Sequence, residues 1–331
     1  MAPEKWSVKL RVKLRRNLLQ LRARLVRPAV LRAARAAAPG LFHVVVPPRV
    51  LDTFEETVEG IADALRILGR AAVVQCVDHL DELGPLKPGD VVLVYGTHRY
   101  DPWAPPPGVV LAGVNVEQYP DGWTPQGTAV PMMQKSDRFL AGCHVVLECN
   151  EALALEAARL GRTPAGVLPF AYTRRFESGL APLADPPFDV AFLGRPGEGR
   201  RKTALERFAT RFKLAPATVA WGRGRGEFLR RAKIQLNLHQ SEKPVVEGHR
   251  LALAYANGAF LLSEPLPPGT PFRAGVHHAE APLAQMEEAI AAWLARPEER
   301  AKIAAEGQRF FRHDYDMTHA VERLLPLFDR H

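Results

Sequence analysis

Cysteine is scarce in this sequence, with three residues in 331: Cys76, Cys143 and Cys149. An odd number without metal-ligand spacing argues against a disulfide framework and against a zinc site. Each cysteine lies beside an apolar run, which indicates buried free thiols in a reducing compartment. Long apolar runs are missing as well, because nowhere do about 18 uncharged apolar residues follow one another. No transmembrane helix is therefore expected.

Excess positive charge is absent from most of the chain, although the net charge is +8. Residues 1–40 hold eleven Lys or Arg and a single acidic residue, Glu4, a balance of +10. The remainder holds 33 basic and 35 acidic side chains, a balance of −2. This distribution argues against nucleic acid as the main ligand.

The basic N-terminal extension, residues 1–40, has the pattern of an amphipathic helix. Its leucines recur at helical spacing, and Lys and Arg occupy the other faces. Over about residues 5–35 such a helix can lie on an anionic membrane surface or bind an acidic protein. Alternatively, its apolar stripe packs on its own protein or on a second copy. The extension is too charged for a secretory signal, so we expect a cytoplasmic protein, peripheral on the inner face of the membrane if the helix binds there.

Alternating strand and helix patterns follow, and they predict an α/β protein with two doubly wound parallel-sheet domains. We place the first domain at 41–170, a proline-bounded linker at 171–187 and the second domain at 188–312. A C-terminal helix within 313–331 can cross back to the first domain. Strands are expected in the first domain at 42–46, 71–76, 90–95, 109–114 and within 138–147, with a helix at about 53–68.

The second domain is organised around residues 233–264, two buried strands joined by one helix. The helix, at about 247–257, is apolar from Leu251 onward, and Gly258 can end it in the left-handed conformation. The expected elements are strands at 189–193, 218–221, 234–238, 259–262 and 275–279, and helices ending near 212 and spanning 283–295, 297–312 and 317–328.

Two features of the second domain suit a phosphate. Glu247 and Arg250 share one face of the helix start, just beyond a strand end, where open α/β sheets bind ligands. The turn at 194–202, GRPGEGRRK, follows another strand, and Gly194 lets the backbone approach a ligand there. Arg195, Arg201 and Lys202 supply positive charge in this turn. The alternatives are a surface ion pair and a solvated basic turn.

Further evidence lies in segments spread over both domains. In the second half these are AFLGRPGEGRRKTAL (191–205), AKIQLNLHQ (232–240), EGHRLALAYANGAFLLSE (247–264) and ARPEERAKIAAEGQRFFRHDYDMTHAVERLL (295–325). In the first half they are GVNVEQY (113–119), DRFLAGCHVVLECNEALALEAARLG (137–161) and LPFAY (168–172). In order and spacing these segments resemble bacterial GT-B glycosyltransferases with a glycosyl-transferase-1-type second domain, over about residues 42–328.

The resemblance implies a nucleoside-diphosphate sugar bound by the second domain. Arg195 and Arg250 would be the diphosphate ligands, with Arg201 or Lys202 behind them. His239, which follows a strand at the same edge, would touch sugar or phosphate. The resemblance implies neither a metal, since the sequence has no Asp-x-Asp motif, nor a cofactor besides the nucleotide-sugar substrate.

One expected feature of the family is missing. Many relatives carry a Glu-x7-Glu pair whose second Glu binds ribose, and the corresponding residues here are Val245 and Leu253. Either Glu247 or Glu264 substitutes, or the donor is placed differently, or activity is lost.

A base for the acceptor hydroxyl is expected in the first domain. Glu117 is the first candidate, followed by His98 and Asp121, because all three can face the ligand edge. Glu117 could instead satisfy a loop, and His98 could be a packed residue. The resemblance thus implies sugar transfer to a hydroxyl of a cell-surface glycan, a lipid or a protein. The alternatives are a non-catalytic nucleotide-binding or partner-recruiting module, or a nucleotide-sugar epimerase.

Overall fold

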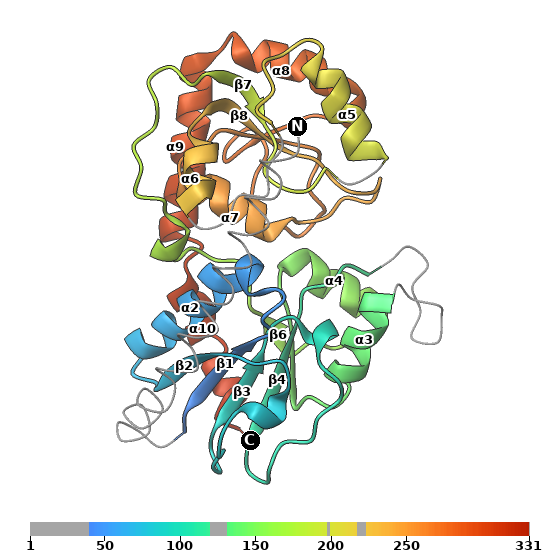
Figure 1. Cartoon of the computed structure of the whole chain (residues 1–331), viewed down its shortest axis with the longest axis vertical. Coiled ribbons are helices and arrows are strands. Elements are labelled where there is room, and N and C mark those ends of the chain that lie inside the picture. Colours follow the sequence, from blue (N-terminus) through green and yellow to red (C-terminus); the bar gives the residue numbers. More distant parts are fainter. Residues whose placement is uncertain (1–39, 120–130, 197–198, 217–222, 331) are drawn as a thin grey trace, which may run out of the picture. The chain divides into compact units, whose positions relative to one another are not determined.

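The computed structural model describes residues 40–119, 131–196, 199–216 and 223–330. The chain divides into two compact units (Figure 1). Unit 1 runs to Glu148 and adds Thr163–Leu168 and the C-terminal residues from Val321 onward, whereas unit 2 comprises Cys149–Arg162 and Pro169–Ala320. The basic extension, Asp121 and the strand expected at 218–221 lie outside the described residues.

Unit 1 contains a parallel six-stranded sheet in the order β2-β1-β3-β4-β5-β6. Its strands are β1 (Phe42–Val46), β2 (Ala72–Cys76), β3 (Val91–Val94), β4 (Val110–Asn115), β5 (Val145–Glu148) and β6 (Gly166–Val167). In the central register Val44 lies opposite Val74 and Leu93. Every residue of β1, β3 and β4 is buried, as expected for strands covered on both faces.

Helices cover the sheet of unit 1. Helix α2 (Leu51–Ile67) packs on β1 and β2, and α3 (Pro131–Leu140) packs against β4 and the short 3-10 helix η2 (Thr97–Arg99) (Figure 1). A second 3-10 helix, η1, spans Leu80–Glu82. At the C-terminus, α11 (Leu325–Phe328) returns to this unit, where the ring of Phe328 meets that of Phe42 edge-on at 5.5 Å.

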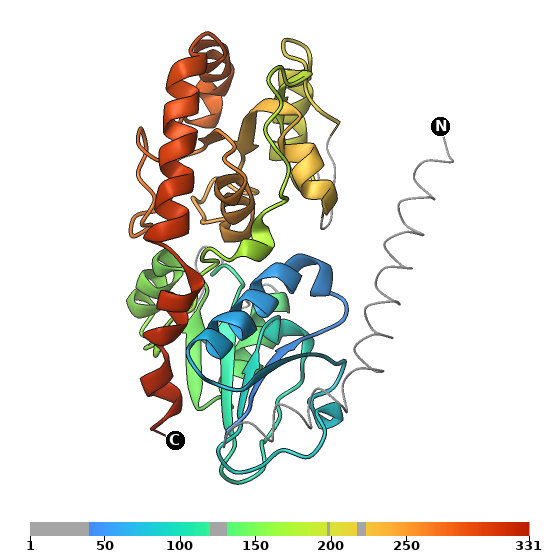
Figure 2. The same cartoon turned by 90° about the vertical axis from the view of Figure 1, so that its left-hand side faces the viewer.

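Unit 2 contains a parallel four-stranded sheet in the order β10-β9-β8-β7. The strands are β7 (Phe188–Ala191), β8 (Ala232–Asn237), β9 (Leu261–Ser263) and β10 (Ala279–Glu280). The helices are α4 (Glu151–Arg159), η3 (Arg174–Phe176), α5 (Arg200–Ala209), α6 (Arg223–Leu229), α7 (Gly248–Ala256), η4 (Leu283–Gln285), α8 (Met286–Leu294) and α9 (Pro297–His313). Helix α10 (Met317–Glu322) leads from this unit into unit 1. The long α9 runs beside α7 and α8 (Figure 2). The predicted α/β architecture with two parallel sheets is confirmed.

The helix at the centre of unit 2 has the predicted character. All residues of α7 from Leu251 to Ala256 are buried, and Gly258 follows with a left-handed φ of +63°. Phe192, Phe208 and Ile234 belong to the core of the unit, which forms between the sheet and the helices. A helix without a polar face is stable here because it is packed on several sides.

Two expected elements differ from the structure. The helix predicted at 317–328 is broken into α10 and α11, with Pro326 in the first turn of α11. Proline has no N–H and its ring clashes with the carbonyl four residues earlier, so one continuous helix cannot form. The strand predicted at 275–279 is mostly a turn, in which His277 N–H donates to Arg273 O, and only Ala279 belongs to β10.

None of the described helices combines the length and the apolarity that crossing a membrane would require. The three cysteines are free. Burial raises the pKa of Cys76 and that of Cys143 to about 12, so both thiols stay protonated at neutral pH.

Candidate functional site

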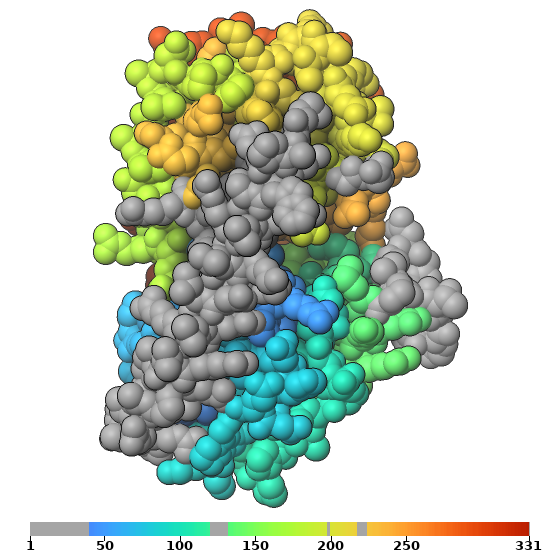
Figure 3. Space-filling view, in the orientation of Figure 1, coloured from blue at the N-terminus to red at the C-terminus, as the bar shows by residue number. Residues whose placement is uncertain are grey.

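The carboxyl ends of the strands in unit 2 bring the predicted phosphate-binding segments to one edge of the sheet. Strand β7 leads through Gly194 to α5, β8 leads through His239 to α7, and β9 is followed directly by Glu264. Parallel strands end at a common edge, so these residues share it. Helix α5, which follows β7, lies at the surface of unit 2 and is yellow in Figure 3.

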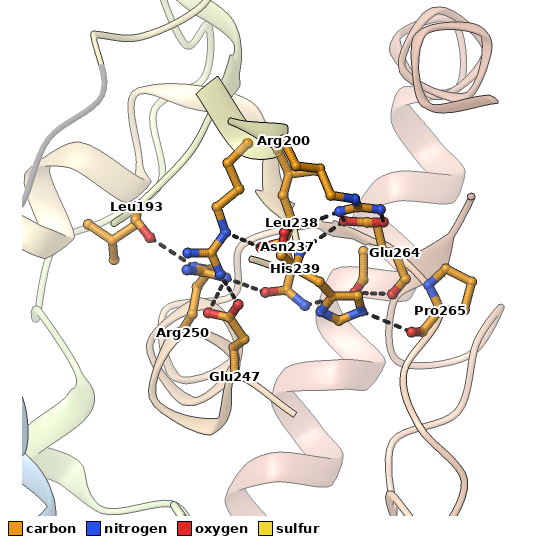
Figure 4. Close-up of polar contacts among 11 residues, drawn as sticks. Leu193, Arg200, Asn237, Leu238, His239, Glu247, Arg250, Glu264 and Pro265 are labelled. Carbon is orange, nitrogen blue, oxygen red and sulfur yellow. Dashed lines mark hydrogen bonds and ion pairs between the residues drawn. The ribbon is translucent and has the colours of Figure 1, made fainter. Parts of the chain in front are cut away.

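Glu247 lies between two arginines at this edge (Figure 4). Its Oε2 is 2.6 Å from Nη1 of Arg250, and its Oε1 accepts a hydrogen bond from Nη2 of Arg201. The three side chains are 11–18% exposed. They therefore form a largely buried cluster and not a surface pair.

Arg250 is held on several sides. Its Nε donates to Leu193 O at 2.9 Å and its Nη1 to Asn237 Oδ1 at 2.6 Å, and its guanidinium lies 4.6 Å from the centre of the Phe192 ring. A Cβ at Gly194, whose φ is +144°, would lie 3.1 Å from Nη2. The close approach of Arg250 thus depends on glycine at this position. Burial lowers the pKa of Arg250, while Glu247 opposes that shift.

A second ion pair joins Arg200 to Glu264. The contact is bidentate: Nη1 is 2.6 Å from Oε2, and Nη2 donates to Oε1. The hydrogen bond to Glu264 raises the pKa of Arg200. Arg200 Nη1 also donates to His239 O at 3.1 Å, and His239 N donates to Glu264 Oε2 at 2.8 Å. The pair therefore ties the start of α5 to the ends of β8 and β9.

Two predicted diphosphate ligands, Arg195 and Lys202, have exposed side chains. Among the described residues, no ion pair joins Arg195 to the cluster around Glu247. Arg201, by contrast, is fixed, because its Nε donates to Leu238 O at 2.8 Å. The structure thus brings together Gly194, Arg201 and Arg250, and leaves Arg195 and Lys202 on the surface.

Two of the predicted base candidates, His98 and Glu117, lie at the carboxyl edge of the sheet of unit 1. His98 Nδ1, in η2 after β3, is 2.9 Å from Glu117 Oε1, which follows β4. Asn115, the last residue of β4, fixes the turn: its Oδ1 accepts from Glu117 N at 3.1 Å and its Nδ2 donates to Glu117 O at 3.2 Å. Because His98 is buried and the Glu117 side chain is 20% exposed, the carboxylate is the more accessible member of the pair.

A buried polar layer supports this pair. Glu148 accepts hydrogen bonds from Asn115 Nδ2 at 2.9 Å and from Tyr119 OH at 2.6 Å. The hydroxyls of Thr97 and Ser136 are 2.7 Å apart. These contacts fix the orientation of the strand ends on which His98 and Glu117 stand.

Two positioning residues were not identified from the sequence. Arg200 holds Glu264 and Asn237 holds Arg250 in unit 2. Asn237 ends strand β8, and this position could have revealed it. In the part of the chain that the structure describes, no group of three or more His, Cys, Asp or Glu side chains is arranged to hold a metal ion.

Comparisons with known proteins bear on the fold. A family model described as "Glycosyl transferase-like" matches residues 200–326, whereas no curated protein sequence matches the chain. Among solved structures, AviGT4, a glycosyltransferase involved in avilamycin A biosynthesis, aligns with a TM-score of 0.58 at 14% identity over 88% of this chain and 98% of its own.

Two further solved structures are similar. Alr3699/HepE from Anabaena, in complex with UDP and glucose, aligns with a TM-score of 0.57 at 9% identity over 88% of this chain and all of its own. TarM aligns with a TM-score of 0.55 at 10% identity over 73% of this chain, and the chain spans 55% of TarM's length. The protein thus has the GT-B fold of glycosyltransferases. Most of the region that matches the glycosyl transferase-like family model, residues 200–326, lies in the second unit.

Proposed function

We propose that the protein transfers a sugar from a nucleoside-diphosphate sugar to a hydroxyl acceptor. The observation that carries this proposal is the cluster of Arg201, Glu247 and Arg250 at the strand edge of unit 2. Two fixed guanidinium groups share one carboxylate there, so the cluster keeps a net positive charge that suits an anionic ligand.

The helices at this edge add to the attraction for phosphate. Helices α5 and α7 both begin without a side-chain cap. The positive ends of their dipoles can therefore attract an anion. A departing nucleoside diphosphate would be stabilised by the same groups, because charge develops on it as the glycosidic bond breaks.

The Glu-x7-Glu pair that many relatives carry is absent here, and the residue at its second position is buried. Leu253 is 3% exposed and packs in the core of unit 2, so it offers nothing to a ligand. Glu264 is engaged by Arg200 and Glu247 by two arginines. We propose that the donor ribose is held by a group other than a free glutamate.

The pair of His98 and Glu117 supports a role in acceptor activation. We propose that Glu117 removes the proton of the acceptor hydroxyl, with His98 and Asn115 fixing its orientation. A base of this kind is needed when transfer inverts the anomeric centre. Asp121 remains an alternative base from the sequence, outside the described residues.

We also propose that transfer needs neither a metal ion nor a cofactor, since the arginines can neutralise the leaving group. Turnover that is unchanged by EDTA would support this. Loss of turnover with EDTA that Mg²⁺ restores would contradict it.

We further propose a cytoplasmic protein whose residues 5–35 bind an anionic membrane or an acidic protein. Sedimentation with anionic vesicles should then be lost on deletion of residues 1–40.

A non-catalytic binding module is the second candidate, and the apolar residues Val245 and Leu253 favour it. The two candidates differ in turnover and share nucleotide binding. Release of nucleoside diphosphate from a nucleotide sugar, in the presence of hydroxyl acceptors, separates them.

Donor binding can be tested by thermal unfolding with millimolar UDP, GDP, TDP, CDP and ADP. A ligand at about 100 times its dissociation constant adds roughly 2.7 kcal/mol to the free energy of unfolding. One diphosphate should stabilise the wild type and the control Arg309→Ala, a surface arginine that is 52% exposed, but not Arg250→Ala. Stabilisation of Arg250→Ala equal to that of the wild type would contradict the proposed site.

A further inference from the structure

His239 is held rigidly at the strand edge of unit 2. It lies two residues after the end of β8 and is 1% exposed. Its backbone is fixed at both ends, by Glu264 at the N–H and by Arg200 at the carbonyl. Its ring is fixed as well, because Nε2 lies 3.0 Å from Pro265 O (Figure 4).

This contact determines which ring nitrogen carries the hydrogen. A carbonyl oxygen can only accept, so Nε2 must donate to Pro265. In the neutral ring Nδ1 then has a lone pair and no hydrogen. Among the residues that the structure describes, nothing donates to Nδ1, although the atom is buried. A buried acceptor without a partner is rare in folded proteins and calls for an explanation, such as a ligand.

The chemistry of Nδ1 restricts that ligand. A lone pair needs a hydrogen-bond donor, and phosphate oxygens that have lost their protons are acceptors. A neutral His239 therefore does not suit the diphosphate, which the arginines attract. Hydroxyl groups do suit it, and a nucleotide sugar carries them on the ribose and on the transferred sugar.

The neighbouring carboxylates are already engaged. Both oxygens of Glu264 bind Arg200, and the two oxygens of Glu247 bind Arg201 and Arg250. Asn237 Oδ1 accepts from Arg250. Of the buried acceptors described at this edge, Nδ1 of His239 is thus the one that keeps its lone pair for a ligand.

We infer that Nδ1 of His239 accepts a hydrogen bond from a sugar hydroxyl of the bound nucleotide sugar. The inference rests on the proposed function and deepens it. In this arrangement Arg201 and Arg250 bind phosphate, and His239 recognises a hydroxyl.

Two substitutions test the contributions of the two ring nitrogens of His239 separately. His239→Gln can still donate to Pro265 O but has no acceptor at the position of Nδ1. His239→Asn places an acceptor near that position and loses the contact with Pro265. His313→Gln, at an exposed position at the end of α9, is the matched control. Melting temperatures show whether each variant folds.

Binding is measured by calorimetry with UDP, 2′-deoxy-UDP, 3′-deoxy-UDP and UDP-glucose, or with the same set on the base that the unfolding panel selects. If the hydroxyl belongs to the ribose, one deoxy analogue binds the wild type about tenfold more weakly than UDP. His239→Gln then binds that analogue and UDP equally. If the hydroxyl belongs to the transferred sugar, His239→Gln weakens UDP-glucose about tenfold and leaves UDP unchanged. In both cases His239→Asn recovers much of the loss.

Two results would overturn the inference. His239→Gln could bind all four ligands as the wild type does, or it could weaken all four equally, which indicates a structural role. Failure of the proposed function looks different, because the wild type would then bind none of the ligands and Arg250→Ala would change nothing.

Discussion

The carboxyl edges of the two sheets carry different polar groups. In unit 2 three arginines and two glutamates form buried or partly buried ion pairs at the strand ends. In unit 1 the corresponding edge joins Asn115, Glu117, Tyr119 and Glu148 by hydrogen bonds, and His98 lies in ion-pair contact with Glu117. Under the proposed function, the same parallel architecture supplies an anion-binding edge in one unit and a proton-accepting group in the other.

The backbone contributes to this difference. Strands β7 and β8 lead into α5 and α7, which are long enough to have a helix dipole. Strand β3 leads instead into the single 3-10 turn η2, which follows Gly96 in the left-handed conformation. A turn of this length has little dipole, so the part of the edge that follows β3 depends on its side chains.

The largest effect is expected at Glu117. Glu117→Gln keeps the size of the side chain and removes the base, so the rate of sugar transfer should fall about 10²- to 10⁴-fold. Affinity for nucleoside diphosphate should stay unchanged, because the substitution leaves the arginines of unit 2 intact. Steady-state rates and calorimetric dissociation constants measure the two quantities, with exposed Glu322→Gln as control. A variant with wild-type turnover would remove Glu117 from the mechanism.

Next in size is the stability effect of Glu264→Gln. The substitution neutralises the carboxylate that Arg200 binds through two hydrogen bonds, and Glu264 is only 3% exposed. Removing one partner of a buried pair costs about 3 kcal/mol. Urea unfolding should show this loss, whereas surface Glu306→Gln should leave stability nearly unchanged. An equal effect of both variants would mean that the Arg200 pair is no stronger than a surface contact.

A smaller effect of opposite sign is expected at Glu247. Glu247→Gln removes the negative charge between Arg201 and Arg250, so nucleoside diphosphate should bind about fivefold more tightly, by ~1 kcal/mol. The gain should shrink in high salt. Titration calorimetry at two ionic strengths measures it. Weaker binding by this variant would instead assign Glu247 a direct contact with the ligand.

The smallest effect concerns His277, away from both edges. Burial lowers the pKa of His277 to about 4, and its ring stacks on Phe310 at 4.2 Å. The folded protein keeps this ring neutral, whereas the unfolded chain protonates it below about pH 6.5. Stability should therefore fall as pH drops from 6.5 to 4. In His277→Phe the melting temperature should depend less on pH over this interval, and an unchanged slope would contradict the assignment.

Local patterns were sufficient to predict most elements of the fold. The apolar run from Leu251, the stop at Gly258 and the buried strands follow from short-range periodicity. Pro326 already argued in the sequence against one continuous helix over 317–328, but the prediction did not take it into account. The strand expected at 275–279 does not form because residues 275–277 make a turn.

The site was harder to predict than the fold. The pair of Glu247 and Arg250 follows from helical spacing. The contact between Arg200 and Glu264 joins residues 64 positions apart, and no local pattern encodes it. His98 and Glu117 were each placed at a strand end, but sequence could not show that their side chains meet. The tautomer of His239 depends on the carbonyl of Pro265, which only the folded chain brings to the ring.

The central claim is that unit 2 binds the nucleoside diphosphate and unit 1 supplies the base. The measurement that tests it most directly compares turnover and binding in the same two variants. Nucleoside diphosphate release from a nucleotide sugar, with a hydroxyl acceptor present, is followed alongside calorimetric binding for Arg250→Ala and Glu117→Gln. Arg250→Ala should lose binding and turnover together, and Glu117→Gln should lose turnover alone. Loss of binding in Glu117→Gln, or full binding in Arg250→Ala, would contradict the account.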